Sequence, residues 1–340
     1  MLNQALDAYS LSNAEPLKNT TGLINDTFII NDEFVLQRIN SGVFHDHHAL
    51  MKNFYTASKH LNEKGCFSDS ITPILTNHGK PFFIDEDGAI WRCYHFIKGK
   101  TFLKPKDTAM IFQTGKAYGE FHMALSDIKE DALSKHSAAL HDPIQRYEEL
   151  LDAIKRDPYD RTKEIGSELL YIEEGIDFLR LLASQISSTP KRPVHNDAKI
   201  SNILFDETSN ERICVVDLDT VSFGFLLYDF GDMVRSCLKN STDILAGFEA
   251  VFSGWYEHTA PLLTDFEETL IVVSCIAVTR ELISRYIADY LNGEVYFHLS
   301  APGDTLKKAR ELIDFCKRYE DSYFKLEELL ENIIKRMKAS

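Results

Sequence analysis

Three polar residues in the second half of the chain have the types and the spacing that phosphoryl transfer requires. Asp197 is followed five positions later by Asn202, and Asp217 comes at the end of the next predicted strand. A carboxylate beside an attacking hydroxyl can orient it and take its proton, which suits Asp197. An amide oxygen and a carboxylate are hard ligands for Mg²⁺, which suits Asn202 and Asp217. The pattern therefore predicts a site that binds a divalent metal and moves a phosphoryl group.

The residues between Asn202 and Asp217 predict the element that brings these two side chains together. Residues 203–205 and 212–216 are mostly apolar or β-branched, and residues 206–210 supply turn formers. A hairpin of these two strands would place Asn202 and Asp217 near one another, where both can face one metal ion.

The stretch from His195 to Asn202 keeps the H-x-D-x-x-x-x-N spacing of eukaryotic-type kinase catalytic loops, and Asp217 takes the place of the metal-binding Asp that follows. It resembles the loop of the aminoglycoside and choline kinase-like phosphotransferases, and further segments resemble one branch of them, the N-acetylhexosamine 1-kinases. Many kinases share the loop, whereas the DLDT and DYLNGE motifs are more specific to the sugar-kinase branch. The matching segments follow the same order over most of the chain: 22–27, 35–40, 216–221, 228–232 and 285–297.

This resemblance implies an α+β, protein-kinase-like, two-lobed fold, with a small N-lobe built on an antiparallel sheet and a larger, mostly helical C-lobe. The N-terminal nucleotide-binding lobe would span 1–97, and the catalytic and acceptor-binding lobe 98–340. The implied activity uses ATP and Mg²⁺ and transfers the γ-phosphate to the anomeric C1-OH of an N-acetylhexosamine (GlcNAc or GalNAc). Asp197 would be the catalytic base that binds the acceptor hydroxyl, and Asn202 and Asp217 the metal ligands.

The resemblance also assigns nucleotide-binding residues in the N-lobe. Gly22 lies where kinases carry a Gly-rich phosphate loop, but it stands alone, without a G-x-G-x-x-G pattern, and a simple turn explains it equally well. Arg38 takes the place of the strand-borne Lys that contacts ATP phosphates; the alternative is a solvated arginine at a strand end. Glu63 is the only acid in the helix predicted over 47–64, so no acid is assigned as the partner of Arg38.

Two further segments complete the predicted nucleotide site. Backbone groups around the lobe hinge would bind adenine, which points to Tyr94, Phe96 and Ile97; these aromatic and apolar residues also fit an ordinary strand core. Lys199, two residues after Asp197, would approach the γ-phosphate, and a solvated loop lysine is the alternative.

On the acceptor side, the resemblance places Asp219 near the metal or the acceptor, although a structural carboxylate that caps nearby amides remains open. Arg285 is a candidate for hydrogen bonds to sugar hydroxyls; it also lies four residues before Asp289, the spacing of an intrahelical ion pair. His195 is expected to support the catalytic loop through hydrogen bonds. Asp229 is expected to cap a helix or to accept hydrogen bonds from that loop.

Other patterns predict the elements that must position these residues. Two strands around Asn31 and Asp32, and further strands up to residue 97, predict an N-lobe sheet of roughly five strands. Apolar residues recur at helical spacing over 109–127, where Gly115 and Gly119 predict close packing against a neighbour. Further helices are predicted over 147–157, 165–186 and 270–291.

Composition narrows the classes of partner. The net charge of −15 argues against nucleic acid; it suits a cationic acceptor, and solubility explains it equally well. The six cysteines form no C-x-x-C pair, and those at 93, 214 and 275 are predicted to be reduced core residues. The longest apolar run is too short to span a bilayer, and a cytoplasmic enzyme without a membrane partner is expected. The oligomeric state is not predicted.

Three alternatives differ in acceptor or in class. The acceptor could be an aminoglycoside, choline or another small alcohol. The single-glycine loop, Arg38 and the absent helix acid would also fit a nucleotide-binding pseudokinase, although Asp197, Asn202 and Asp217 are intact. A protein kinase is disfavoured, because only ten residues separate Asp217 from Tyr228, which leaves little room for a peptide-docking loop.

Overall fold

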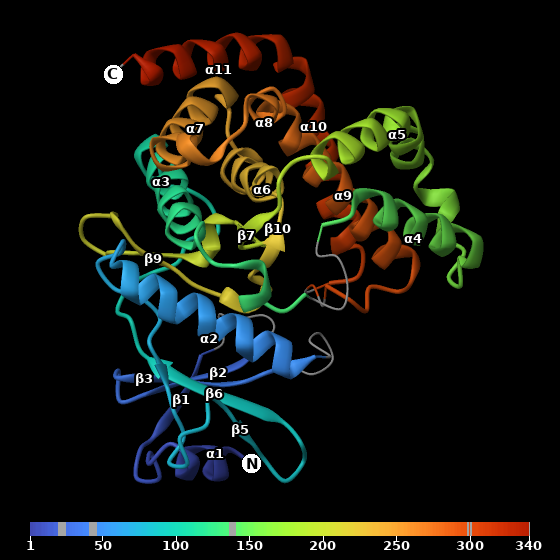
Figure 1. The fold of residues 1–340 in the computed structure, drawn as a ribbon. Helices are drawn as coiled ribbons and strands as arrows, with labels where there is room; N and C mark the ends of the chain where they lie inside the picture. The colour runs from blue at the N-terminus through green and yellow to red at the C-terminus, as the bar shows by residue number, and fades with distance from the viewer. Residues whose placement is uncertain (20–24, 41–45, 136–140, 298, 300, 340) are drawn as a thin grey trace.

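A computed structural model describes the chain except for residues 20–24, 41–45, 136–140, 298, 300 and 340. Figure 1 shows a small lobe built around a sheet and a larger lobe built mainly of helices, with the short strands between residues 192 and 224 where the two meet. The α+β, kinase-like architecture predicted from the sequence is confirmed. The exact boundary near residue 97 stays a prediction, although Lys100 already pairs with Phe205 of the larger lobe.

The small lobe contains a six-stranded antiparallel sheet, one strand more than the roughly five predicted. Its strands run in the order β1-β2-β3-β6-β4, and β5 also pairs with β6. Asn31 and Asp32 turn the chain between β2 and β3 with φ angles of 53° and 55°, a left-handed conformation that Asn and Asp tolerate best after glycine. The strands are β1 Pro16–Asn19, β2 Asp26–Ile30, β3 Phe34–Arg38, β4 Pro73–Ile74, β5 Phe83–Ile84 and β6 Ile90–His95.

A helix covers each face of this sheet. The outer face carries Leu36 and Trp91, which pack with Leu6 of helix α1 (Leu2–Ala8) in a small separate core. Helix α2 (His47–Lys64), predicted over the same residues, covers the inner face and packs into the main core. The Asp46 side chain accepts a hydrogen bond from Ala49 N at 2.9 Å, which satisfies a free amide of the first turn.

The larger lobe is built around helices that pack closely. Gly115 of α3 and Gly254 of α7 let the two backbones meet: a Cβ at Gly115 would stand 2.1 Å from the Val251 carbonyl oxygen. The close packing predicted for α3 is therefore confirmed. The helices are α3 Thr108–Leu125, α4 Pro143–Arg156, α5 Gly166–Ser187, α6 Leu226–Leu238, α7 Ile244–Thr259, α8 Asp265–Glu268, α9 Ile271–Leu291, α10 Asp304–Asp321 and α11 Tyr323–Lys338.

Two short ribbons form the catalytic segment. Strands β8 (Ile203–Phe205) and β9 (Arg212–Val215) make the predicted hairpin, with Ile203 opposite Val215. Strand β7 (Arg192–Val194) precedes this hairpin in the chain and β10 (Ser222–Gly224) follows it, and these two strands pair with each other. A single 3₁₀ turn, Ile200–Asn202, leads into β8, and another, Leu218–Thr220, follows β9. The hairpin therefore brings Asn202 and the start of the DLDT motif together by local chain geometry alone.

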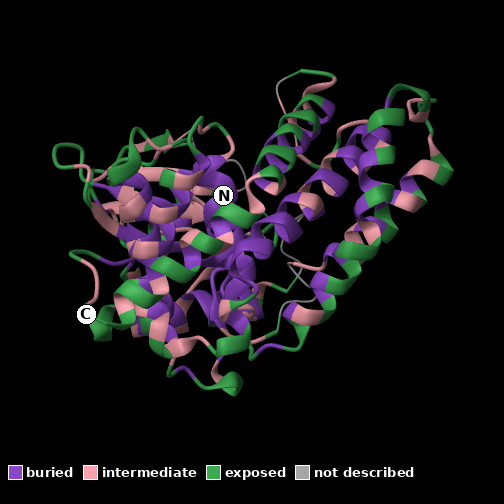
Figure 2. Ribbon diagram, turned by 90° about the horizontal axis from the view of Figure 1, so that it is seen from above, coloured by how far each residue is buried: buried purple, intermediate pink, exposed green. Residues whose placement is uncertain are grey.

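Burial follows this layout. Figure 2 shows buried residues along the inward sides of the helices and exposed residues on the outward sides. All six cysteines are free, and those at 93, 214 and 275 are buried as predicted. Within the described residues, no helix is both long and apolar enough to cross a membrane.

Candidate active site

The catalytic loop holds Asp197 in an ionised state. Lys199 Nζ lies 2.6 Å from Asp197 Oδ2, and Asn202 Nδ2 donates to the same oxygen at 3.1 Å and to the Asp197 carbonyl at 2.9 Å. Burial opposes ionisation, but the neighbouring ammonium and amide outweigh it and hold the pKa of Asp197 below its usual value. The carboxylate is therefore free of its proton at neutral pH and can accept one.

Asp217 is a buried carboxylate whose surroundings shift its pKa in the opposite direction to that of Asp197. It follows β9 with a φ of 62°, in the left-handed region. Burial, together with the negative charges of Asp219 and Asp197, raises the pKa of Asp217 to about 6. A carboxylate in this position is stabilised by a cation, and so Asp217 fits a divalent metal.

Asn202 supplies the second matching ligand. Its amide nitrogen is committed to Asp197, which leaves Oδ1 as the atom available to a cation. Over the described part of the chain, no three His, Cys, Asp or Glu side chains are grouped to hold a metal. A metal here would therefore take its remaining ligands from phosphate oxygens and water, as Mg²⁺ commonly does.

Buried hydrogen bonds hold this loop in place. Asp229, near the start of α6, accepts from the backbone N–H groups of His195 and Asn196 at 2.6 and 2.7 Å. His195 Nε2 donates to the Val216 carbonyl at 3.0 Å, so the histidine ties the loop to the strand before Asp217. His195 and Asp229 are thus positioned as structural supports of the loop.

A layer beneath the loop was not anticipated from the sequence. His122 of α3 contacts Asp229 Oδ2 at 2.8 Å, and Trp255 Nε1 donates to the other nitrogen of the His122 ring at 3.0 Å. The Tyr118 hydroxyl donates to the Lys199 carbonyl at 3.0 Å. These contacts come from helices far away in the sequence, and the only sequence signal was a polar residue within an otherwise apolar helical stripe.

Asp219 is held by side chains of the small lobe. It forms an ion pair with Arg92 of β6, and both side chains are only 2% exposed. Asn25 Nδ2 donates to the second Asp219 oxygen at 2.8 Å, and Gln37 Oε1 accepts from the Arg92 guanidinium at 2.9 and 2.7 Å. The guanidinium also lies 4.1 Å above the ring of Phe54 in α2. Both oxygens of Asp219 are therefore engaged by the small lobe.

The structure does not bring Arg38 together with the catalytic loop. Strand β3 pairs Gln37 with Arg92 and Arg38 with Trp91, and neighbouring residues of a strand point to opposite faces. Because Trp91 packs under α1, Arg38 lies on the outer face of the sheet, where its side chain is 39% exposed and 4.0 Å from Asp26. Arg92 is a buried cation on the inner face. Its signal in the sequence was a charged residue within an apolar strand.

Comparison with known proteins gives the family. The model of the phosphotransferase enzyme family, APH, matches residues 17–262. The chain belongs to this phosphotransferase family. The match includes the catalytic loop, the β8–β9 hairpin and the Arg92–Asp219 pair, so these features lie within the shared enzyme unit.

Solved structures of kinases share the fold of this phosphotransferase. A microcompartment-associated aminopropanol kinase has a TM-score of 0.68 at 16% identity, with 96% of this chain and 98% of that chain covered. An aminoglycoside phosphotransferase from Alicyclobacillus acidocaldarius has a TM-score of 0.66 at 13% identity, with 97% and 96% covered. Spectinomycin phosphotransferase, solved with ADP and spectinomycin, has a TM-score of 0.65 at 14% identity, with 94% and 97% covered.

The predicted adenine-binding residues lie where the phosphotransferase chain passes between the lobes. Tyr94 is on the inner face of β6, with its ring 6.0 Å from that of Phe54. The Phe96 N–H donates to the Glu33 carbonyl at 2.8 Å, and Ile97 is buried in the main core. Gly22 lies outside the described residues. The adenine contacts and the phosphate loop therefore stay predictions.

Arg285 of α9 contacts aromatic residues of the segment that follows the helix. Its guanidinium donates to the Tyr296 hydroxyl at 3.1 Å and lies 5.6 Å from the centre of the Phe297 ring. Asp289 does not pair with it; it accepts from the backbone N–H groups of Tyr296 and Phe297 at 2.8 and 3.2 Å. The DYLNGE motif thus folds the chain back so that aromatic residues lie beside Arg285.

Proposed function

We propose that this phosphotransferase is an ATP-dependent small-molecule kinase that transfers the γ-phosphate to a sugar hydroxyl, the anomeric C1-OH of an N-acetylhexosamine such as GlcNAc or GalNAc. The observation that carries the reaction class is the convergence of Asp197, Asn202 and Asp217, with Asp197 ionised and Asp217 in need of a cation. An intact set of these three groups also argues against a pseudokinase.

The residues of the chain have distinct roles in this reaction. Asp197 orients the acceptor hydroxyl and takes its proton as the bond to phosphorus forms. Lys199, held by Asp197, offers a positive charge to the transferred phosphoryl group. Asn202 Oδ1 and Asp217 would hold Mg²⁺, which when bound neutralises charge on the phosphate oxygens. Asp229 and His195 keep the loop in the geometry that this transfer needs.

The charges on the helical-lobe side of the loop support a neutral acceptor. Asp232 is paired with Arg235 at 2.8 Å, and Glu281 lies 3.1 Å from His141. Asp289 is held by backbone N–H groups. An aminoglycoside carries several ammonium groups and is best bound by carboxylates that are not already compensated. The DLDT and DYLNGE resemblance favours a sugar on independent grounds.

A second candidate is an amino alcohol or aminoglycoside acceptor. Two structural neighbours, an aminopropanol kinase and a spectinomycin phosphotransferase, are named for acceptors of this kind. The net charge of −15 would also attract a cationic acceptor. Sequence identities of 16% and 14% to these neighbours support a shared fold but do not identify the acceptor. The acceptors must therefore be compared directly in an assay.

The deciding experiment is an acceptor panel assayed for ADP release with ATP and Mg²⁺. The panel contains GlcNAc, GalNAc, glucose, galactose, spectinomycin, kanamycin, choline and aminopropanol. We expect turnover of an N-acetylhexosamine, with loss of its reducing end because C1 becomes esterified. A panel in which only the cationic compounds react would replace the sugar assignment with the second candidate. ATP turnover that no compound stimulates would support the pseudokinase.

A further inference from the structure

Three ionisable side chains from distant parts of the chain meet beside α6. His141 precedes α4, Asp232 lies in α6, and Glu281 lies in α9. His141 Nδ1 is 3.1 Å from Glu281 Oε2, and His141 Nε2 is 4.0 Å from Asp232 Oδ2. The three side chains are 9%, 8% and 2% exposed in the order His141, Asp232, Glu281. None of them has a role in the loop geometry described above.

Two atoms of this cluster are enclosed without a partner among the described residues. They are His141 Nε2 and Glu281 Oε1. The 4.0 Å between His141 Nε2 and Asp232 Oδ2 is too long for a hydrogen bond. Asp232 Oδ1 already accepts from Arg235 at 3.0 and 2.8 Å, which leaves Oδ2 on the side of the histidine. Buried polar atoms are nearly always paired, so an unpaired set of this kind indicates a place for a ligand atom.

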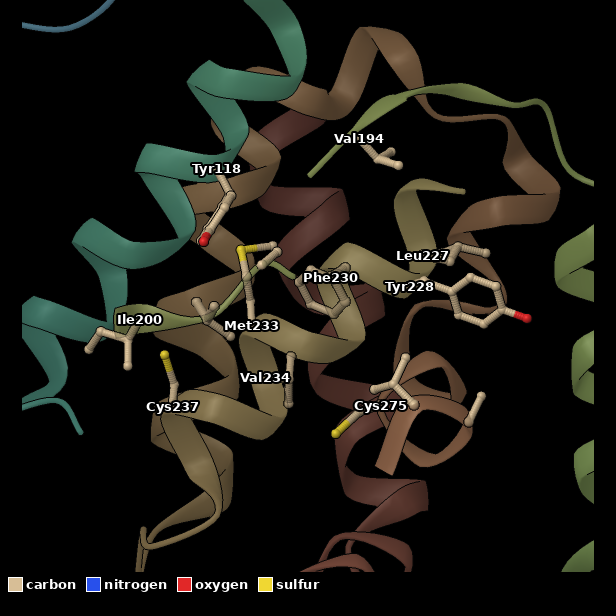
Figure 3. Close-up of a cluster of buried hydrophobic side chains, with 14 of the residues drawn as sticks. Tyr118, Val194, Ile200, Leu227, Tyr228, Phe230, Met233, Val234, Cys237 and Cys275 are labelled. Carbon is tan, nitrogen blue, oxygen red and sulfur yellow. The ribbon is translucent and has the colours of Figure 1, made fainter. Parts of the chain in front are cut away.

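The cluster lies next to the catalytic loop. The His141 ring stacks on Tyr228 with ring centres 5.2 Å apart, and the next residue, Asp229, holds the loop backbone. Asp232, one turn further along α6, is a negative charge that helps to raise the pKa of Lys199. Ser236 of the same helix accepts a hydrogen bond from the Ile200 N–H at 3.2 Å. Figure 3 shows Tyr228 at the edge of the apolar cluster, with its hydroxyl directed away from it. Helix α6 thus carries both the loop support and Asp232.

We propose that His141 Nε2 and Asp232 Oδ2 form a hydroxyl-binding subsite for the acceptor, in which one non-reacting hydroxyl of a neutral sugar accepts a hydrogen bond from His141 and donates one to Asp232. This deepens the proposed function and rests on it. A hydroxyl is the simplest group that can do both, because it has one donor and two acceptor lone pairs. An ammonium group has only donors and would face the N–H of His141.

The groups around His141 keep it a donor. Burial favours the neutral ring, but Glu281 on α9 and Asp232 and Asp229 on α6 outweigh it, and the pKa of His141 rises to about 9. Asp142 and the Tyr228 ring are also near, and the guanidinium of Arg235 is paired with Asp232. At neutral pH both ring nitrogens therefore carry protons, one directed to Glu281 and the other to the subsite.

The test separates acceptor binding from nucleotide chemistry. In His141→Leu we expect the KM for the N-acetylhexosamine to rise at least tenfold, while the KM for ATP and the slow hydrolysis of ATP without acceptor stay within twofold. His141→Gln retains an amide donor and should recover part of the loss. His78→Leu, in an exposed turn of the small lobe, is the matched control and should behave as wild type.

Deoxy sugars identify the hydroxyl and keep the proposal testable if a variant folds poorly. For wild type, the analogue that lacks the bound hydroxyl should lose at least tenfold in kcat/KM, and for His141→Gln the same analogue should lose less. The wild-type KM for the full sugar should also rise as pH passes about 9. Unchanged sugar KM in His141→Leu, or equal losses for all analogues in both enzymes, overturns the subsite.

The two levels of the proposal fail in different ways. If wild type phosphorylates no N-acetylhexosamine, the proposed function fails and the subsite falls with it. If wild type phosphorylates the sugar but the His141 variants bind it as well as wild type does, the function stands and only the subsite is overturned. A parallel rise of the KM for ATP with a lowered melting temperature would show a structural role instead, and also overturns the subsite.

Discussion

On the sheet-lobe side of the catalytic segment, Arg92 and Asp219 form a buried pair with nearly every polar atom engaged, through Asn25 and Gln37. On the helical-lobe side, His141, Glu281 and Asp232 are almost as buried, but two of their atoms have no partner in the described chain. Burial costs are similar in kind on both sides. A satisfied cluster fixes one arrangement of the chain, whereas an unsatisfied one is completed by something that binds.

The loop between the two clusters gives the largest expected effect. Asp197→Asn removes the proposed proton acceptor and preserves the shape of the side chain, so we expect kcat to fall about a thousandfold, within the range for a lost general base. The KM for ATP should change little. Steady-state ADP release with saturating acceptor measures both constants. If the substitution leaves the rate unchanged, Asp197 is not the base. The loop between the two clusters would then not be the reaction centre that both clusters flank.

The satisfied cluster is tested by breaking it. Arg92→Leu leaves Asp219 charged, buried and without its cation, so the free energy of unfolding should fall by about 3–5 kcal/mol, read from urea denaturation. Arg180→Leu is the matched control, since Arg180 pairs with Asp177 on the exposed surface and such pairs contribute little. If both variants unfold at the same urea concentration, the Arg92 pair does not join the lobes in the way described.

A refinement of that experiment addresses function. Arg92→Lys keeps the charge but loses the planar fork that contacts Asp219 and Gln37 together. We expect kcat to fall about tenfold while folding is retained, because Asp219 lies two residues from Asp217, the proposed metal ligand. Melting temperature and kcat measured on one preparation separate the two effects. Loss of stability without loss of kcat would leave the pair purely structural.

The unsatisfied cluster has a distinct pH signature. The folded-state pKa of His141, about 9, lies above the ordinary value of 6.5. The stabilisation from its charge is therefore fully present below about pH 6.5 and is lost as pH rises through 9. The difference in unfolding free energy between wild type and His141→Gln should be largest near pH 6 and should shrink above pH 9. A difference that is constant from pH 6 to 10 contradicts the charge-pair description.

The smallest expected effect concerns Arg38. Because the structure places it on the outer face of the sheet, Arg38→Ala should change the KM for ATP by less than twofold, measured by initial rates over a range of ATP concentrations. A tenfold rise would restore the phosphate-binding role that its position in the sequence indicated. It would also mean that Arg92 is not the main small-lobe cation at the site.

Prediction from sequence succeeded where the interacting residues are close along the chain. The span from Asp197 to Asp217 is a loop and a hairpin, and turn residues with apolar strands define such a unit locally. Helix α2 was predicted at its observed bounds because its apolar face and end signals lie within it. The strand that carries Arg92 was also predicted, but which of its neighbours would face the site depends on strand register, which the local pattern does not fix.

The sequence by itself determined the family resemblance, the two-lobed α+β fold and the order of the catalytic groups, because each depends on short-range spacing. Only the tertiary structure decided what surrounds them: Arg92 meets Asp219 across 127 residues, His122 meets Asp229 across 107, and His141 meets Glu281 across 140. Such pairs form when helices and lobes pack, and packing brings together side chains whose separation in the sequence carries no periodic signal. The reaction class was therefore readable from the sequence, and the side chains that surround the proposed catalytic groups were not.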